Sequence, residues 1–148
     1  MEQPLDAEMM MAIIERHLAA EAAGDVALTM ESVAPEPLYE FHPMGYRIAS
    51  RDSVAELYRR VLPSQKQRTG VSIRRNLWFS AEGCAIETES RFNDETGREH
   101  VAANIVAFTF EAGLIKSERV FLDPKAPAAF DAALGVDFLS LPGVSVRR

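Results

Sequence analysis

The first part of the chain carries apolar residues at helical spacing. The stretch from Asp6 to Ala23 has one apolar stripe, which predicts a helix. Asp25 is a suitable cap for a second, short helix that includes Val33 and is ended by Pro35. The stretch from Ser50 to Pro63 has apolar residues at i, i+3, i+4, i+7 and i+8, and its proline is expected to close this third helix.

Downstream, the pattern alternates with a period of two, as in strands with one buried face. Two short strands, Leu38 to His42 and Tyr46 to Ala49, flank a turn at Pro43-Met44-Gly45. Four longer strands follow: Val71 to Ser80, Cys84 to Phe92, Val101 to Phe110 and Leu114 to Leu122. In the first of these four, the alternation places Ile73 and Leu77 on the same face. The third is nearly continuous in apolar residues, which is typical of a strand buried on both sides.

Helices that come first and strands joined by hairpins afterwards predict an antiparallel α+β domain, not a doubly wound parallel sheet. We expect a single domain over residues 1–148, with a core at about 6–123 and a tail at 124–148. The tail predicts a short helix from Ala126 to Leu134, and Phe138 then needs burial across the pocket mouth or against a second subunit. A long antiparallel sheet with helices on one face must curve around them, which leaves a concave space for a ligand.

Composition narrows the function classes. Apolar residues make up 47% of the 148 residues and charged residues 26%, as in an average soluble protein. With a net charge of −6 and no basic stripe, the chain is a poor candidate for binding nucleic acid. No basic leader and no membrane-spanning run is present, and a single cysteine, Cys84, forms no internal disulfide. We therefore expect a cytoplasmic protein without membrane contact, whose partner is a small molecule or its own copy.

Four stretches carry a family resemblance: Ile14 to Asp25, Tyr39 to Gly45, Ala55 to Tyr58 and Gly113 to Asp123. In this order they resemble the opening helix, the first strand with its Pro-x-Gly turn, the third helix and the last strand of SnoaL-like and ketosteroid-isomerase-like proteins. These belong to the nuclear transport factor 2-like superfamily. The resemblance implies a cystatin-like curved antiparallel sheet wrapped around three N-terminal helices, a pocket for a small hydrophobic molecule, and a homodimer, to which the outer sheet face around Trp78 is suited. It singles out no activity, because the superfamily includes isomerases, cyclases, dehydratases and non-catalytic binders.

At most positions that the resemblance aligns with the steroid-isomerase site, this chain has a different residue. The resemblance aligns His17 with the tyrosine donor on the first helix, and His42 with the aspartate base before the Pro-x-Gly turn. Val106 falls at or near the second oxyanion donor, and Tyr58 matches a tyrosine that supports the site. Since a valine side chain donates no hydrogen bond, the resemblance argues against steroid isomerase activity.

The polar residues that remain could still carry chemistry. A histidine titrates near neutrality, a glutamate in an apolar pocket has its charged form disfavoured, and an asparagine can donate to a developing oxyanion. Together they suit isomerase, cyclase or dehydratase chemistry that begins with proton abstraction next to a carbonyl. The predicted catalytic residues are therefore His17, His42, Asn104 and Glu118, and the predicted ligand-binding residues are Tyr58, Val106, Phe108 and Val120.

Each of these residues also has a purely structural interpretation. His17 and Tyr58 could be packed core residues with satisfied hydrogen bonds, and Glu118 could be a solvated strand residue. The three histidines lack a short-spaced pair, so we expect no metal site, and no glycine-rich phosphate motif or other cofactor signature is present. The alternative to an acid–base enzyme is thus a non-catalytic ligand-binding or assembly module.

Overall fold

The computed structural model describes residues 5–67, 72–94 and 96–147, so Val71 of the predicted third strand lies outside the described residues. Two helices begin the chain. α1 (Ala7–Ala23) starts after Asp6, whose carboxylate accepts a backbone N–H of the first turn at 2.8 Å, and it ends at Gly24 with a φ of 71°. α2 (Val26–Glu31) starts after Asp25, which caps it in the same way.

α3 (Arg51–Gln67) is longer than predicted, because Pro63 lies inside it. A proline has no N–H, so the carbonyl of Arg59, four residues earlier, lacks its helical partner. Pro63 is exposed, where water can bind that carbonyl. The prediction that this proline closes the helix was wrong.

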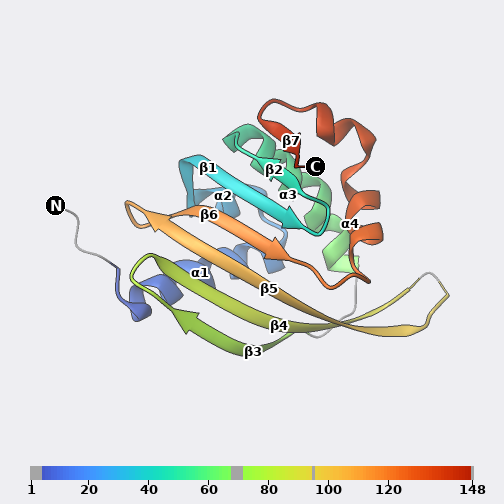
Figure 1. Ribbon diagram of the computed structural model, residues 1–148, viewed down its shortest axis with the longest axis horizontal. Helices are drawn as coiled ribbons and strands as arrows, with labels where there is room; N and C mark the ends of the chain where they lie inside the picture. The colour runs from blue at the N-terminus through green and yellow to red at the C-terminus, as the bar shows by residue number, and fades with distance from the viewer. Residues whose placement is uncertain (1–4, 68–71, 95, 148) are drawn as a thin grey trace.

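Within the described residues, seven strands form one sheet in the order β3-β4-β5-β6-β1-β2-β7 (Figure 1). Their bounds are β1 (Val33–His42), β2 (Tyr46–Ile48), β3 (Ser72–Phe79), β4 (Gly83–Asn93), β5 (Glu99–Glu111), β6 (Leu114–Phe121) and β7 (Val144–Val146). All neighbours are antiparallel except β1 and β6, which are parallel. The predicted α+β class and the meander of four long strands are confirmed.

β1 begins earlier than predicted and runs through Pro35 and Pro37. Val33, expected in the second helix, pairs with Ile115 of β6 instead. The register then shifts before regular pairing resumes at Leu38. Because prolines cannot donate to a ladder of hydrogen bonds, the irregularity falls where they occur.

A bulge in β3 changes which of its residues face the helices. The register against β4 shifts between Arg74 and Asn76, so one extra residue lies in β3. Since side chains alternate between faces, Ile73 lies on the outer face, where it is 41% exposed, whereas Leu77 packs against the core. The predicted common face for Ile73 and Leu77 was wrong.

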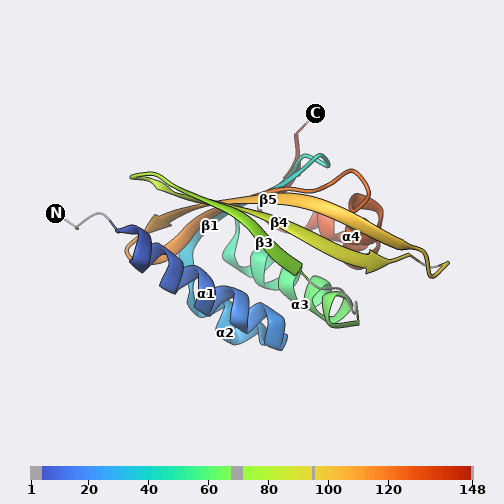
Figure 2. The ribbon, with the colours of Figure 1, turned by 90° about the horizontal axis from the view of Figure 1, so that it is seen from below.

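α1, α2 and α3 cover the concave face of the curved sheet (Figure 2). One core cluster is built around Tyr39 and Leu57, and the other packs Ile14 of α1 on Phe108 of β5. No helix in the described ranges is long and apolar enough to cross a membrane. The fold thus encloses space between the helices and the sheet.

The outer, convex face of the sheet carries none of the described helices (Figure 2). On this face, Val101 and Ile105 of β5 are 38% and 40% exposed. The strand predicted to be buried on both sides is therefore buried on one side only within a single chain.

The tail packs on its own chain. α4 (Pro127–Leu134) lies where a helix was predicted, and a 3-10 helix (Val136–Ser140) follows and buries Phe138 completely. Arg60 of α3 donates two hydrogen bonds of 2.9 Å to the carboxylate of Asp137. The last strand, which the sequence pattern did not predict, extends the sheet beside β2.

Candidate functional site

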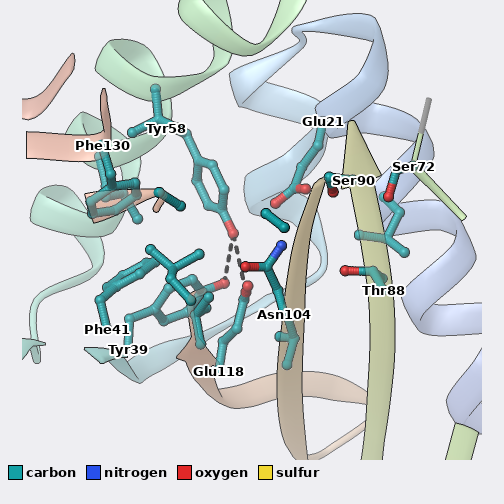
Figure 3. A pocket seen from close by; sticks show the side chains of 18 of the residues that line it. Glu21, Tyr39, Phe41, Tyr58, Ser72, Thr88, Ser90, Asn104, Glu118 and Phe130 are labelled. Atoms are coloured by element: carbon teal, nitrogen blue, oxygen red, sulfur yellow. Dashed lines mark hydrogen bonds between the residues drawn. The ribbon is translucent and has the colours of Figure 1, made fainter. Parts of the chain in front are cut away.

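A cavity of about 440 Å³ lies between the concave face of the sheet and the helices α1, α3 and α4. This volume is within the range of pockets that hold small organic molecules. Most of the wall is apolar, and Figure 3 shows the polar side chains that lie on it. The lining includes the predicted residues Tyr58, Asn104, Val106, Phe108, Glu118 and Val120, together with Glu21, Tyr39, Phe41 and Phe130.

Five side chains from four elements meet at the inner end of this pocket. The Nε2 atom of His17 lies 3.0 Å from the hydroxyl of Tyr58 and 3.2 Å from the carboxylate of Glu21. The Tyr58 hydroxyl lies 3.0 Å from that of Tyr39 and 3.4 Å from a carboxylate oxygen of Glu118. Their contacts join the imidazole, two phenols and two carboxyls into one hydrogen-bonded group, which we call the inner polar group.

The tautomer of His17 follows from its second nitrogen. The hydroxyl of Ser32 donates its only proton to the carbonyl of Thr29 at 2.8 Å. It must therefore accept from Nδ1–H of His17, which lies 2.7 Å away. We assign the proton of the neutral imidazole to Nδ1, so Nε2 faces Tyr58 and the carboxyls with a lone pair or with a second proton.

The two proton states of His17 use the same neighbours in different ways. When the imidazole is neutral, Nε2 accepts a hydrogen bond from the Tyr58 hydroxyl. When it is protonated, Nε2–H donates to Glu21, and Tyr58 is free to donate to Glu118. Movement of one proton thus reorients a whole hydrogen-bonded chain without moving a heavy atom.

The surroundings favour protonation of both His17 and Glu118. Burial raises the pKa of Glu118 to about 7 and the charge of Glu21 adds to this, while His17 and the two tyrosine hydroxyls oppose it. Burial lowers the pKa of His17, but the hydrogen bond to Glu21 and the charges of Glu118 and Glu21 outweigh it, so the net pKa is raised. Glu118 therefore exchanges its proton in the neutral range, and His17 holds its second proton more tightly than an ordinary imidazole does.

The two phenols stay protonated at neutral pH. Burial is the main reason that the pKa values of Tyr39 and Tyr58 lie well above 10, and the charge of Glu118 raises them further. These hydroxyls can therefore act as hydrogen-bond donors next to a carboxyl that can lose its proton.

His42 does not lie with the other predicted catalytic residues. In β1, Tyr39 and Phe41 face the pocket, so His42 points to the outer face, where its ring stacks on Phe121 at 4.8 Å. The expectation from the resemblance that His42 lies in the pocket is therefore wrong. The side to which the last residue of a strand points depends on the register of pairing, which the sequence does not state.

Asn104 lines the pocket, but at some distance from the inner polar group. It is four residues before Phe108 in β5, and Phe108 is the residue paired with Glu118. Four residues of strand span roughly 13 Å at 3.3 Å per residue. Asn104 and Glu118 thus face the same cavity from two different places.

Sequence reasoning missed Glu21, Tyr39 and Ser32. Glu21 stands one helical turn after His17, a spacing that puts both side chains on one face of α1. Tyr39 could have been found from the alternation in β1, because it shares a face with Phe41. Ser32 follows the short helix α2 and had no signal in the pattern.

His17, Glu21 and Glu118 also form a set of groups that could hold a metal ion. Their ligand atoms lie within 4.8 Å of one another, and no other such set occurs in the described part of the chain. Sequence spacing could not predict this set, because Glu118 is distant in the chain. The hydrogen bonds above already provide a partner for each of these groups without a metal ion.

Known proteins were compared with the chain by sequence and by structure. No family model and no curated protein matches the sequence. The structure resembles that of an uncharacterised protein with a cystatin-like fold from Silicibacter pomeroyi, with a TM-score of 0.70 and 20% identity over 93% of this chain and 98% of the other. It also resembles a protein from Jannaschia assigned as a SnoaL-like polyketide cyclase, with a TM-score of 0.68 and 12% identity over 86% and 96%.

These similarities show that the chain has the nuclear transport factor 2-like fold predicted from its sequence. They show nothing more specific, as another similar structure illustrates. A de novo designed protein with a curved β-sheet matches over 87% of this chain and 97% of its own, with a TM-score of 0.68 and 16% identity. The side chains in the pocket, and not the fold, therefore decide the function of the chain.

Proposed function

We propose that this chain is a small acid–base enzyme that acts on an uncharged, largely apolar carbonyl compound bound in the pocket. The observation that supports it most is the position of the inner polar group. It places the carboxyl of Glu118 and the phenol of Tyr58 at the wall of an apolar cavity, and the buried imidazole of His17 is in hydrogen-bond contact with that phenol. The fold is shared with proteins that include a SnoaL-like polyketide cyclase, which is compatible with such chemistry.

In the proposed reaction, the carboxylate of Glu118 removes a proton from the carbon next to the carbonyl. The electrons of the broken C–H bond form the C=C bond of an enol, and the carbonyl oxygen takes up negative charge or a proton. Tyr58 can donate a hydrogen bond to that oxygen, because its hydroxyl lies only 3.4 Å from the carboxylate. Base and donor are thus spaced to reach two adjacent atoms of one substrate.

His17 then supports both partners. Its Nε2 atom touches Tyr58 at 3.0 Å and can supply the proton that follows the phenol's hydrogen bond towards the substrate oxygen. Return of the proton from Glu118 to another carbon gives isomerisation. Its transfer to a β-hydroxyl, which leaves as water, gives dehydration, and attack of the enol on a second carbonyl, whose oxygen takes that proton, gives ring closure.

The direct test is exchange of hydrogen for deuterium next to the carbonyl of neutral cyclic enones in D2O, followed by NMR. We expect exchange above the buffer rate with the unaltered chain and its loss with Glu118→Gln. Glu87→Gln serves as a matched control, because Glu87 pairs with Ile105 on the outer face, away from the pocket. Equal exchange by Glu118→Gln and the unaltered chain would contradict the assignment.

A non-catalytic binding protein is the second candidate. One observation favours it: every buried side-chain nitrogen and oxygen in the described ranges already has a hydrogen-bond partner. A polar group that is satisfied from within can serve stability alone. This candidate predicts that enones bind unchanged, and that substitutions of His17 and Glu118 lower the free energy of unfolding without any activity to lose.

A further inference from the structure

The pocket has a second polar region, farther along β4 and β5 from the strand position that pairs with Glu118. Thr88 and Ser90 of β4 and Asn104 of β5 line it there, and Thr88 pairs directly with Asn104 across the two strands. Nearer the inner end, the same faces of these strands carry only apolar side chains, such as Ile86 and Val106. The polar part of this wall is therefore confined to the stretch of β4 and β5 that carries Thr88, Ser90 and Asn104.

The amide of Asn104 is oriented by the backbone. Its Oδ1 atom accepts the N–H of Asp123 at 2.9 Å. The opposite atom, Nδ2, must then be a donor, and no described residue accepts a hydrogen bond from it. The hydroxyls of Thr88 and Ser90 likewise have no partner among the described residues. Three neutral groups with hydrogen-bonding capacity thus face the cavity together.

Between the two polar regions the wall is apolar. Phe41, Val106 and Val120 lie there, and Phe130 of α4 packs on Phe41 with ring centroids 4.8 Å apart. About 13 Å of strand separates Asn104 from the position opposite Glu118, so a molecule that follows the strands from one region to the other is elongated.

Charge limits what the far end of such a molecule carries. Arg91, the only basic residue that lines the described cavity, is paired with Glu99 at 3.3 Å. The inner end holds two carboxyls against one imidazole, which disfavours an anion there. A neutral hydroxyl or carbonyl suits the groups of Thr88, Ser90 and Asn104 better than a carboxylate or phosphate does.

We infer that Asn104, Thr88 and Ser90 form a specificity subsite for a hydroxyl or carbonyl group at the end of the ligand remote from the reacting carbonyl. This inference rests on the proposed function, because that function places the reacting carbonyl at Glu118 and so decides which end of the ligand lies at the subsite. The substrate class is then an elongated, neutral molecule with an apolar middle and a polar group at each end.

The test compares two probes, the ten-carbon enone 3-decen-2-one and its derivative with a hydroxyl on carbon 10. We expect the hydroxylated probe to bind roughly 3- to 10-fold more tightly by NMR titration, the effect of one net hydrogen bond. Thr88→Val and Asn104→Leu should bring this ratio towards one. Thr88→Ser, which keeps the hydroxyl, should retain the ratio.

Equal affinity of the two probes for the unaltered chain, or an unchanged ratio in Thr88→Val and Asn104→Leu, would overturn the subsite. Absence of binding by the hydroxylated probe would overturn it as well. Deuterium exchange on the bound probes keeps the two proposals apart. Selective binding without exchange supports the subsite and contradicts the proposed enzymatic activity. Exchange without selective binding supports the activity and contradicts the subsite.

Discussion

Two side chains of the inner polar group bind protons more tightly in the folded chain than in the unfolded one. Glu118 has a folded pKa of about 7 against an ordinary value of 4.5, and the pKa of His17 is raised above 6.5. A group with a raised pKa stabilises the fold while it is protonated, and this contribution is lost as the pH rises through the folded pKa.

We therefore expect the free energy of unfolding to fall between about pH 5 and pH 8, by an amount that urea titrations at several pH values can measure. Asp137, whose pKa is lowered by Arg60, is fully ionised in this window and adds no slope. Glu118→Gln should remove much of the decrease. A free energy of unfolding that rises over this range would show that the two groups are not buried together as described.

The hydroxyl of Tyr58 is the donor closest to the proposed base. Tyr58→Phe should lower kcat/KM for an accepted enone by roughly 100-fold, as expected when one donor to a developing oxyanion is removed. Tyr46→Phe is the matched control, since Tyr46 donates its hydroxyl to Asp131 and does not line the pocket. Loss of activity in both variants to the same extent would assign the effect to stability.

For single residues, the sequence predicted the residue types of the site better than their positions. His17, Tyr58 and Glu118 do lie together, because helical spacing and strand alternation fix the faces of α1, α3 and β6. The position of His42 could not be predicted, since it depends on pairing between β1 and β6. The distance between Asn104 and Glu118 depends in the same way on the register of β5 and β6.

Among the elements, α4 forms part of the pocket wall. It contributes Ala126, Phe130 and Ala133 to the lining, and Phe130 packs on Phe41. We expect Phe130→Ala to weaken binding of 3-decen-2-one about 10-fold, because an apolar wall is lost. Val136→Ala is the control, since Val136 lies just after α4 with 95% of its side chain exposed. Unchanged affinity in Phe130→Ala would mean that the ligand does not reach α4.

The predicted boundaries of the elements were right where capping residues set them. They were wrong where the local signals were ambiguous. Asp6 and Asp25 begin their helices as predicted. Pro63 did not end α3, and the bulge in β3 moved Ile73 to the outer face. A proline inside a helix costs about 3 kcal/mol, so the packing of α3 has to outweigh that cost, and tertiary packing decides such positions.

For the whole molecule, the convex face of the sheet carries exposed apolar side chains that no described helix covers. It exposes Trp78, Ile105 and Phe121, each between 40% and 47% exposed. Ile105 and Phe121 are cross-strand neighbours, and exposed apolar groups that lie together favour association. We expect two copies to associate through this face, so that β5 becomes buried on both sides.

Light scattering after gel filtration tests this expectation. The unaltered chain should have the mass of a dimer, and Ile105→Asp should shift it to the mass of a monomer. Val136→Asp, at an exposed position outside the sheet, should not. A monomer at all concentrations, or a dimer that survives Ile105→Asp, would place the interface elsewhere or exclude it.

The fold of the whole molecule could be predicted because the sequence pattern shows the order of its helices and strands. Helices followed by a hairpin-linked meander allow few topologies, and the predicted curved sheet around three helices is observed. The final strand was not predictable, since Val144 to Val146 is too short to show alternation and joins the sheet only through pairing with β2.

The central claim is that His17 and Glu118 form one proton-sharing group at the pocket wall. An NMR pH titration of the imidazole nitrogens, in the unaltered chain and in Glu118→Gln, tests it most directly. His42, on the outer face, is an internal control whose signals the substitution should leave unchanged. We predict that His17 titrates above 6.5 with its neutral proton on Nδ1, and that Glu118→Gln lowers its pKa. A His17 that titrates below 6.5 and does not respond to Glu118→Gln would contradict the account.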